Sequence, residues 1–122
     1  MTTESVQSAI ETTMQTFESE DRWECIQLYS SEGLLLAGHG VSPVYGHDQL
    51  LEFCFSLIET VRLLGTEQPV KEIIIRGEKK RHLVFRFFES WDETAVLAAV
   101  LHGRKGYRRA MTKLMKLIQN ID

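Results

Sequence analysis

The chain is 122 residues long, with 43% hydrophobic and 25% charged residues and a formal net charge of -3 at pH 7. These values predict one globular domain over residues 1–122 and exclude collagen-like and intrinsically disordered chains. The longest apolar run, AVLAAVL at 95–101, is far shorter than the roughly 20 residues of a membrane-spanning helix. The N-terminus has no basic start followed by an apolar stretch, so we expect a cytoplasmic protein without a transmembrane segment.

Charge is distributed unevenly along the chain. Residues 1–67 hold 11 acidic and 2 basic side chains, whereas residues 68–122 hold 6 acidic and 12 basic ones. Such asymmetry can indicate contact with nucleic acid or a membrane, but opposite solvated faces of one folded unit are the simpler interpretation. Cys25 and Cys54 form no CxxC pair and lie among apolar residues, so we expect buried free thiols.

The first third of the chain predicts a helix followed by a hairpin. Apolar residues recur at three- and four-residue steps over 5–18, which predicts an amphipathic helix that ends before the acidic ESEDR stretch. Apolar segments at 23–30 and 34–38 flank the turn residues SSEG. This pattern predicts two short antiparallel strands.

A second amphipathic helix is predicted at 48–64, with Gly65 as its stop signal. Its apolar side chains span about 200° of the circumference, more than the packing of one sheet face needs. Leu51, Phe55 and Ile58 lie on one margin of this arc, and we expect them to contact a second subunit or a partner protein. The alternative is that the first or the last helix covers them.

The remaining elements are three strands and a helix. Apolar runs of strand length at 70–77, 81–89 and 94–101 predict a three-strand meander. The segment 107–121 carries apolar residues on one face and basic residues on the other, which predicts a third amphipathic helix. The predicted order is helix, two strands, helix, three strands, helix: an α+β sandwich of one sheet and its helices.

Three consecutive isoleucines, Ile73, Ile74 and Ile75, occupy the first strand of the meander. Apolar side chains on both faces make an edge strand hazardous, because its unpaired backbone would template aggregation. If this strand lies at an edge of the sheet, we expect it to pair with another strand across an interface. If it is central, this argument fails.

No motif with a catalytic mechanism is present: the chain has no P-loop, nucleophile elbow, HExxH or GxGxxG pattern. His39 and His47 are close enough in sequence to share a loop, but metal binding would need a third ligand, and their spacing matches no metal-ligand pattern. Gly38 and Gly40, which flank His39, are interpreted as the exit from the second strand. We expect no catalytic residue, no metal and no cofactor.

Basic residues concentrate between the third and fourth strands and in the last helix. The candidates for a basic surface are Lys79, Lys80, Arg81, Arg108 and Arg109. Phe85 and Phe87 would suit nucleic-acid binding if they were exposed, but they alternate inward with core residues, and the chain as a whole is acidic. A solvated charged face is therefore the favoured interpretation, and nucleic acid is not an expected partner.

The order of elements, together with SSEGLLLAGHG, HLVFRFFE, TAVLAAVL and GRKGYRRAMTKL, resembles the roadblock family of dynein-associated light chains and small-GTPase regulators. The resemblance covers roughly residues 5–120; members commonly carry Asp-Gly in the first hairpin, where this chain has Glu32-Gly33. It implies a profilin-like, five-stranded antiparallel sheet with one helix on one face and two on the other. It further implies a homodimer or heterodimer in which the third strand pairs with its counterpart and the middle helices pack together.

The resemblance also implies binding to a small Ras-like GTPase, as a scaffold or as an activator. The chain is therefore interpreted as a non-enzymatic dimeric interaction module that regulates or scaffolds such a GTPase. The GTPase role in this interpretation rests on analogy of fold. The alternative is a regulatory or sensory module that binds an acidic ligand or nucleic acid through the basic hairpin and the C-terminal helix. A steep loss of binding with salt would favour this alternative.

Overall fold

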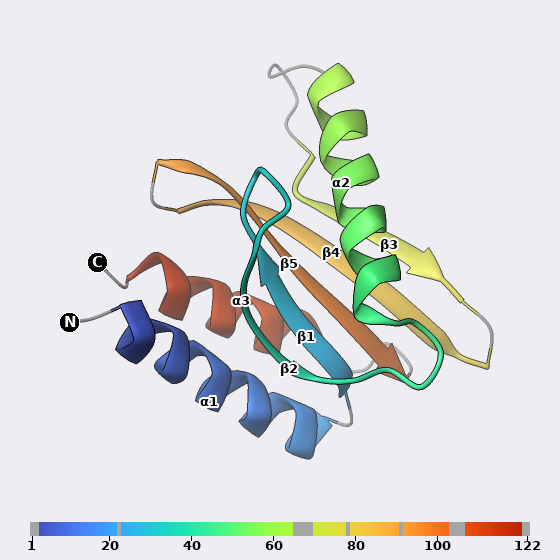
Figure 1. Cartoon of the computed structure of the whole chain (residues 1–122). Coiled ribbons are helices and arrows are strands. Elements are labelled where there is room, and N and C mark those ends of the chain that lie inside the picture. Colours follow the sequence, from blue (N-terminus) through green and yellow to red (C-terminus); the bar gives the residue numbers. More distant parts are fainter. Residues whose placement is uncertain are drawn as a thin grey trace.

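Three helices and five strands follow one another in the predicted order (Figure 1). The computed structural model describes residues 3–21, 23–64, 70–77, 79–90, 92–102 and 107–120, without the side chains of 3–5 and 17–21. The helices are α1 (Thr3–Asp21), α2 (His47–Leu63) and α3 (Tyr107–Gln119). The strands are β1 (Trp23–Tyr29), β2 (Leu35–Gly40), β3 (Glu72–Arg76), β4 (Arg81–Ser90) and β5 (Glu93–His102). Gly65, the predicted stop of the middle helix, lies outside the described residues.

The strands form one antiparallel sheet in the order β2-β1-β5-β4-β3. β4 and β5 pair along their whole length, from Arg81 opposite His102 to Ser90 opposite Glu93. Every residue from Ala95 to Leu101 is buried, because β5 lies in the middle of a sheet with helices on both faces. β3 lies at one edge of the sheet. We therefore expect this isoleucine strand to need a partner strand across an interface.

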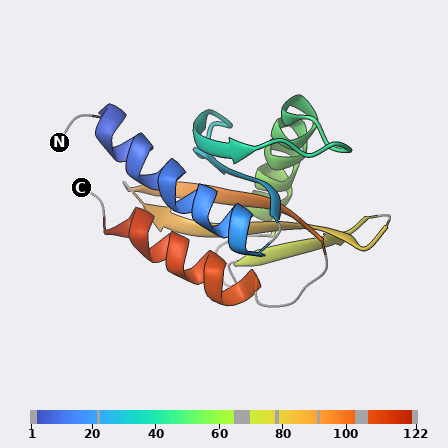
Figure 2. The ribbon, with the colours of Figure 1, turned by 90° about the horizontal axis from the view of Figure 1, so that it is seen from below.

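The two faces of the sheet carry different helices (Figure 2). α1 and α3 pack against one face, where Ile10 and Met14 of α1 meet Met111 and Leu114 of α3 in a shared core. α2 covers the opposite face with its buried residues Leu50, Cys54 and Ile58. Successive strand residues point to opposite faces, so each central strand contributes to both cores.

Two boundaries differ from the prediction. α1 continues through the acidic stretch to Asp21, since glutamate is a good helix former. β2 does not end at Gly38: Gly38 pairs with Gln27, His39 with Ile26 and Gly40 with Cys25. The predicted exit from the sheet is therefore confirmed at Gly40 but placed too early at Gly38 and His39, because β1 supplies a pairing partner for each of these residues. The strand ends at Gly40, whose φ of 84° suits glycine.

Candidate interaction surfaces

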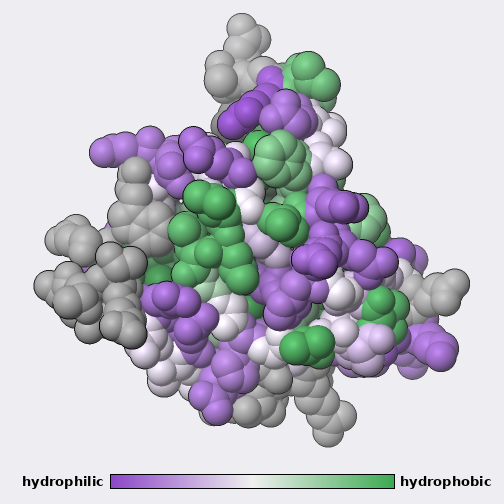
Figure 3. All heavy atoms as spheres, in the orientation of Figure 1, coloured by the Kyte–Doolittle hydropathy of each residue, from purple (hydrophilic) through white to green (hydrophobic). Residues whose placement is uncertain are grey.

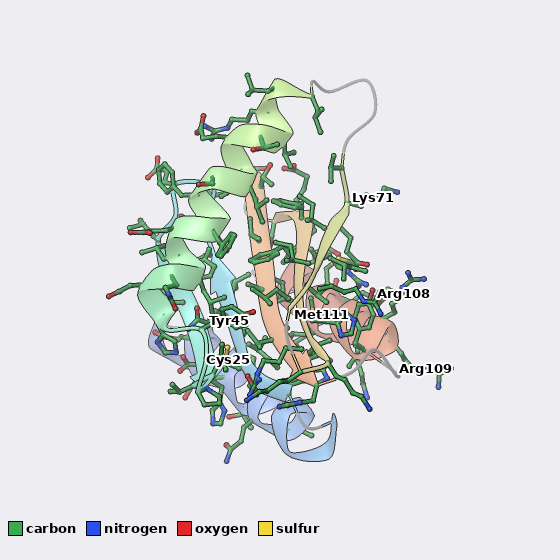
Figure 4. The ribbon with its side chains drawn as sticks, turned by 90° about the vertical axis from the view of Figure 1, so that its right-hand side faces the viewer. Cys25, Tyr45, Lys71, Arg108, Arg109 and Met111 are labelled. Atoms are coloured by element: carbon green, nitrogen blue, oxygen red, sulfur yellow. The ribbon has the colours of Figure 1, made fainter. Side chains whose placement is uncertain are left out.

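The edge strand β3 is half-buried on both faces but not at its outer edge. Ile73 and Ile75 pack toward the core under α2, and Ile74 packs toward the core under α1 and α3. Among the described residues, β3 has a strand neighbour, β4, on one side only. Figure 4 looks onto this edge, which lies between α2 and α3. The three isoleucines of β3 therefore pack within this chain, and the outer edge of the strand exposes backbone N–H and C=O groups.

Charged groups fix the start of β3. The Glu72 carboxylate accepts hydrogen bonds from Arg86 Nε at 3.1 Å and Nη2 at 2.9 Å, and from the Tyr107 hydroxyl at 2.9 Å. Arg86 Nη1 also donates to Thr112 Oγ1 at 2.7 Å. Because these groups come from β3, β4 and α3, they hold the edge strand in place against the rest of the fold.

The helix margin that the sequence singled out faces the β1–β2 hairpin. A Cβ atom on Gly33 at the hairpin tip would lie 2.6 Å from Phe55 Cδ2 and 3.8 Å from Leu51 Cδ1. Phe55 remains 49% exposed, whereas Ile58 is only 5% exposed and belongs to the core under α2. α1 and α3 lie on the other face of the sheet (Figure 2), so the alternative that one of them covers this margin is wrong.

The opposite flank of α2 faces β3. Phe53 lies two residues from Phe55, about 160° away around the helix, and is 42% exposed. The hairpin beside Phe55 and the strand β3 stand at opposite ends of the strand order, so Phe55 and the isoleucines of β3 do not share one surface. The apolar arc of α2 has two margins, one at Phe53 and one at Phe55. From the sequence, a partner is predicted only for the margin at Phe55.

An exposed apolar patch lies beside Phe55. Leu34 and Leu35 of the hairpin are 61% and 52% exposed. Figure 3 shows apolar side chains gathered over this hairpin and the neighbouring flank of α2. We call Leu34, Leu35 and Phe55 the hairpin patch.

The basic candidates fall into two groups at opposite ends of β3. Arg108 and Arg109 lie in the first turn of α3, which Tyr107 ties to the start of β3, and they project outward together with Lys71 (Figure 4). Lys79 and Lys80 form the turn that follows the end of β3. Basic residues therefore flank the edge strand rather than forming one continuous surface.

The aromatic residues among these cations are not available for stacking. Phe85 is fully buried and Phe87 is 7% exposed, which confirms their predicted inward direction. A nucleic-acid platform of the kind considered from the sequence would require exposed rings.

Arg81 differs from the other basic candidates because it is held by a buried carboxylate. Glu24, whose side chain is 9% exposed, accepts one bifurcated hydrogen bond from the N–H of Arg81 Nε, with its two oxygens at 3.0 and 3.2 Å, and contacts His102 Nε2 at 2.7 Å. Ser42 Oγ also donates to Glu24 at 2.7 Å. This network joins β1, β4 and β5 to the loop before α2, and no local pattern in the sequence indicates it.

Two hollows border β3. One, of about 790 Å³, lies at its start, between the end of α2, the end of β4 and α3. The other, of about 470 Å³, lies at its end, between the loop that precedes α2 and the turn that joins β3 to β4. Both are therefore continuous with the exposed edge of the sheet.

The remaining candidates have structural contacts. Ser30 Oγ accepts hydrogen bonds from the backbone N–H groups of Glu32 and Leu34, which confirms its predicted role in the turn. His47 Nε2 lies 3.1 Å from the Gly40 carbonyl oxygen. The described residues contain no group of three side chains suited to a metal ion. Cys25 and Cys54 are buried and form no disulfide, as predicted, and burial raises the pKa of Cys54 to about 12.

No protein-family model matches the sequence, and no curated protein matches it. Solved structures resemble it in fold. MglB of Myxococcus xanthus has a TM-score of 0.68 at 15% identity, covering 92% of this chain and 86% of that chain. Gliding protein MglB of Thermus thermophilus has a TM-score of 0.66 at 17% identity, covering 95% and 93%. A Roadblock/LC7 domain from Streptomyces avermitilis has a TM-score of 0.60 at 16% identity, covering 88% and 90%.

These likenesses confirm the fold that the sequence resemblance implied: the chain has the roadblock/LC7 fold, with one helix on one face of a five-stranded antiparallel sheet and two on the other. None of the helices described in the structure is both long enough and apolar enough to cross a membrane.

Proposed function

We propose that this chain is a non-enzymatic, dimeric interaction module of the cytoplasm that regulates or scaffolds a small Ras-like GTPase. The observation that carries the proposal is a roadblock-type fold with two separate surfaces that no other described part of the chain covers: the edge of β3 and the hairpin patch. Two surfaces are what a module needs if it both self-associates and recruits another protein.

Self-association is assigned to β3 and the adjoining flank of α2. An antiparallel pairing of two copies centred on Ile74 would place Glu72 of each copy opposite Arg76 of the other, on the same face of the extended sheet. Opposite charges directly across two strands favour that register. Phe53, exposed on the flank that faces β3, would then pack against the second copy. MglB, a protein of the same fold, occurs in a tetrameric arrangement, so self-association is compatible with the fold.

The GTPase is assigned to the hairpin patch. Its three apolar side chains are about half exposed or more, and the exposed acidic residues Glu32 and Glu52 lie beside them. An apolar centre with a charged rim is the usual anatomy of a protein–protein interface. Because this patch lies on the other side of α2 from β3, both surfaces can be occupied at once.

The test is capture from the native lysate by the tagged chain, loaded in parallel with GDP and with a non-hydrolysable GTP analogue, with proteins identified by mass spectrometry. We expect one small GTPase whose capture depends on the nucleotide. Phe55→Glu should abolish this capture, whereas Ser56→Glu, which adds the same charge at the next exposed position of α2, should retain it. Absence of any small GTPase from both lanes, with the wild-type chain folded, would contradict the proposal.

A further inference from the structure

The hollow at the end of β3 is lined mainly by cationic and apolar residues. Arg76, Gly77, Lys79 and Arg81 form one wall, and Val44 and Tyr45 of the loop before α2 form the other. Among the described residues of this lining, three are cationic and none is acidic. We call this hollow the β3-end pocket.

Both walls of the β3-end pocket are fixed by one carboxylate. Glu24 holds Arg81 through a bifurcated hydrogen bond from Nε to both carboxylate oxygens. The same carboxylate accepts a hydrogen bond from Ser42 Oγ, which in turn accepts hydrogen bonds from the backbone N–H groups of Val44 at 3.2 Å and Tyr45 at 3.1 Å. The walls are therefore held at a set separation without a ligand, and such preorganisation lowers the cost of binding.

The turn that joins β3 to β4, within the cationic wall, has an unfavourable backbone conformation. Lys79 and Lys80 have φ values of 54° and 64°, a region that glycine and asparagine occupy more easily than lysine. Lys79 nevertheless lines the pocket. Backbone strain of this kind is concentrated at binding sites. There, a lysine contributes a charged side chain that glycine would not provide.

Tyr45 reaches across the pocket to the opposite wall. A Cβ atom on Gly77 would lie 2.5 Å from the Tyr45 hydroxyl oxygen, so the absence of a side chain at Gly77 gives the hydroxyl its place. Figure 4 shows Tyr45 on the α2 side of the sheet. The pocket thus combines three cations with a neutral hydrogen-bond donor and an apolar ring.

We propose that the β3-end pocket binds the phosphate group of a small organic phosphate. The Lys79 ammonium and the Arg76 guanidinium line the same pocket and suit a multiply charged oxyanion, and Arg81, whose Nε is bound by Glu24, adds its Nη groups as further donors. A volume of about 470 Å³ exceeds that of one phosphate, and Val44 and Tyr45 provide apolar contact for the organic part. The inference does not depend on the GTPase, and Lys79 and Arg81 still line the pocket when Arg76 pairs with Glu72 of a second copy.

The test measures binding to the full chain by calorimetry at low and at physiological salt. The soluble probe is inorganic triphosphate; the lipid probe is a vesicle containing phosphatidylinositol phosphates, with phosphatidylcholine vesicles as the blank. Binding to the first probe shows that the pocket takes a soluble phosphate group, and binding to the second alone identifies a lipid headgroup. If the wild-type chain binds neither probe, the proposal is overturned.

Lys79→Gly and Lys80→Gly form a matched pair of variants. Each removes one positive charge and relieves one positive φ, so each should unfold no more easily than the wild type, but only Lys79 lines the pocket. Lys79→Gly should weaken binding about tenfold or more, as expected for loss of a charge-assisted contact, and Lys80→Gly less than about twofold. Equal losses in the two variants would show attraction by net charge alone, and no loss in either would exclude this pocket; both results would overturn the proposal.

Discussion

Among the individual residues, Glu24 connects more elements than any single candidate that the sequence suggested. Its buried carboxylate bonds Arg81 on β4 and Ser42 before α2, and contacts His102 on β5. Glu24→Gln would leave the Arg81 guanidinium, which is only 11% exposed, without a charge partner. Loss of one member of a buried ion pair costs about 3 kcal/mol of unfolding free energy, and we expect a loss of this size in urea denaturation.

Glu59→Gln is the matched control for that measurement. Glu59 pairs with Arg62 at 3.0 Å, but both side chains are more than half exposed. An exposed pair of this kind contributes less than about 1 kcal/mol. Equal effects of the two substitutions would mean that the Glu24 network contributes no more than a surface ion pair.

The buried thiol of Cys54 predicts how stability depends on alkaline pH. Burial raises its pKa from 9.0 to about 12, so in the folded chain the thiol keeps its proton at pH values where the unfolded chain has lost it. The resulting stabilisation is complete below about pH 9 and is lost as pH rises from 9 toward 12. Melting temperatures should therefore fall over this range, and Cys54→Ala should fall less steeply than the wild type.

Two features sharpen this test. Burial also raises the pKa of Tyr29, so part of the alkaline decline should remain in Cys54→Ala. Ile58→Ala removes a neighbouring buried side chain that does not titrate and should lower the whole curve without changing its slope. An alkaline slope in Cys54→Ala equal to that of the wild type would refute the role of the thiol.

At the scale of the elements, local apolar periodicity is sufficient to predict a helix or strand whose structure depends on its own residues. The apolar spacing of α2 and α3 and the apolar runs of β4 and β5 predict these elements to within a few residues of their observed bounds. Burial of one face sets the apolar spacing of a helix, and burial of both faces gives a central strand a continuous apolar run. The end of β2 is predicted too early, at Gly38 instead of Gly40, for the opposite reason. Two glycines favour leaving a sheet, but pairing with β1 keeps them in it, and a partner strand is not a local property.

The candidate surfaces were predictable only in part for the same reason. The triple isoleucine motif identifies β3 as a strand that needs a partner, and the structure places it at an edge. Which margin of α2 faces β3 depends on the crossing of helix and sheet, and nothing within residues 48–64 specifies that. The contacts of Glu24 with Arg81 span 57 residues of sequence and leave no local pattern.

The contact between the hairpin and α2 can be tested at Gly33. Its φ is 83°, and a Cβ atom there would lie 2.6 Å from Phe55 Cδ2. Gly33→Ala combines a left-handed backbone with this clash, and the backbone alone costs about 1–2 kcal/mol. We expect a loss of unfolding free energy larger than that figure by chemical denaturation.

A double variant separates the two causes. Adding Phe55→Ala to Gly33→Ala removes the clash but not the backbone strain, so the two substitutions together should cost less than the sum of the single losses. Strict additivity would show that the phenyl ring moves away freely and does not fix the hairpin against α2.

For the molecule as a whole, the two edges of the sheet are not equivalent. The edge strand β2 lies beside α1, which packs on the hairpin strands, whereas the edge of β3 is flanked by cationic residues, among them Lys71 and Arg108 (Figure 4). Charges beside an edge normally discourage indiscriminate strand pairing. Pairing centred on Ile74 is the arrangement in which opposite charges, Glu72 and Arg76, face each other, so the same charges that repel other strands favour one specific partner, a second copy.

Arg76→Glu tests this self-pairing. Two-fold symmetry places the substituted residue opposite Glu72 at both ends of the paired strands, which turns two attractions into two repulsions. We expect the dissociation constant of the dimer, measured by analytical ultracentrifugation, to rise about tenfold or more, and high salt to reduce the difference because the repulsion is screened. Arg76→Gln, which removes the attraction without creating repulsion, should have a smaller effect, and Lys79→Gly should have none. A dimer that tolerates Arg76→Glu would show that the copies meet in another register or through another surface, because no other antiparallel alignment of β3 brings these two charges together at both ends.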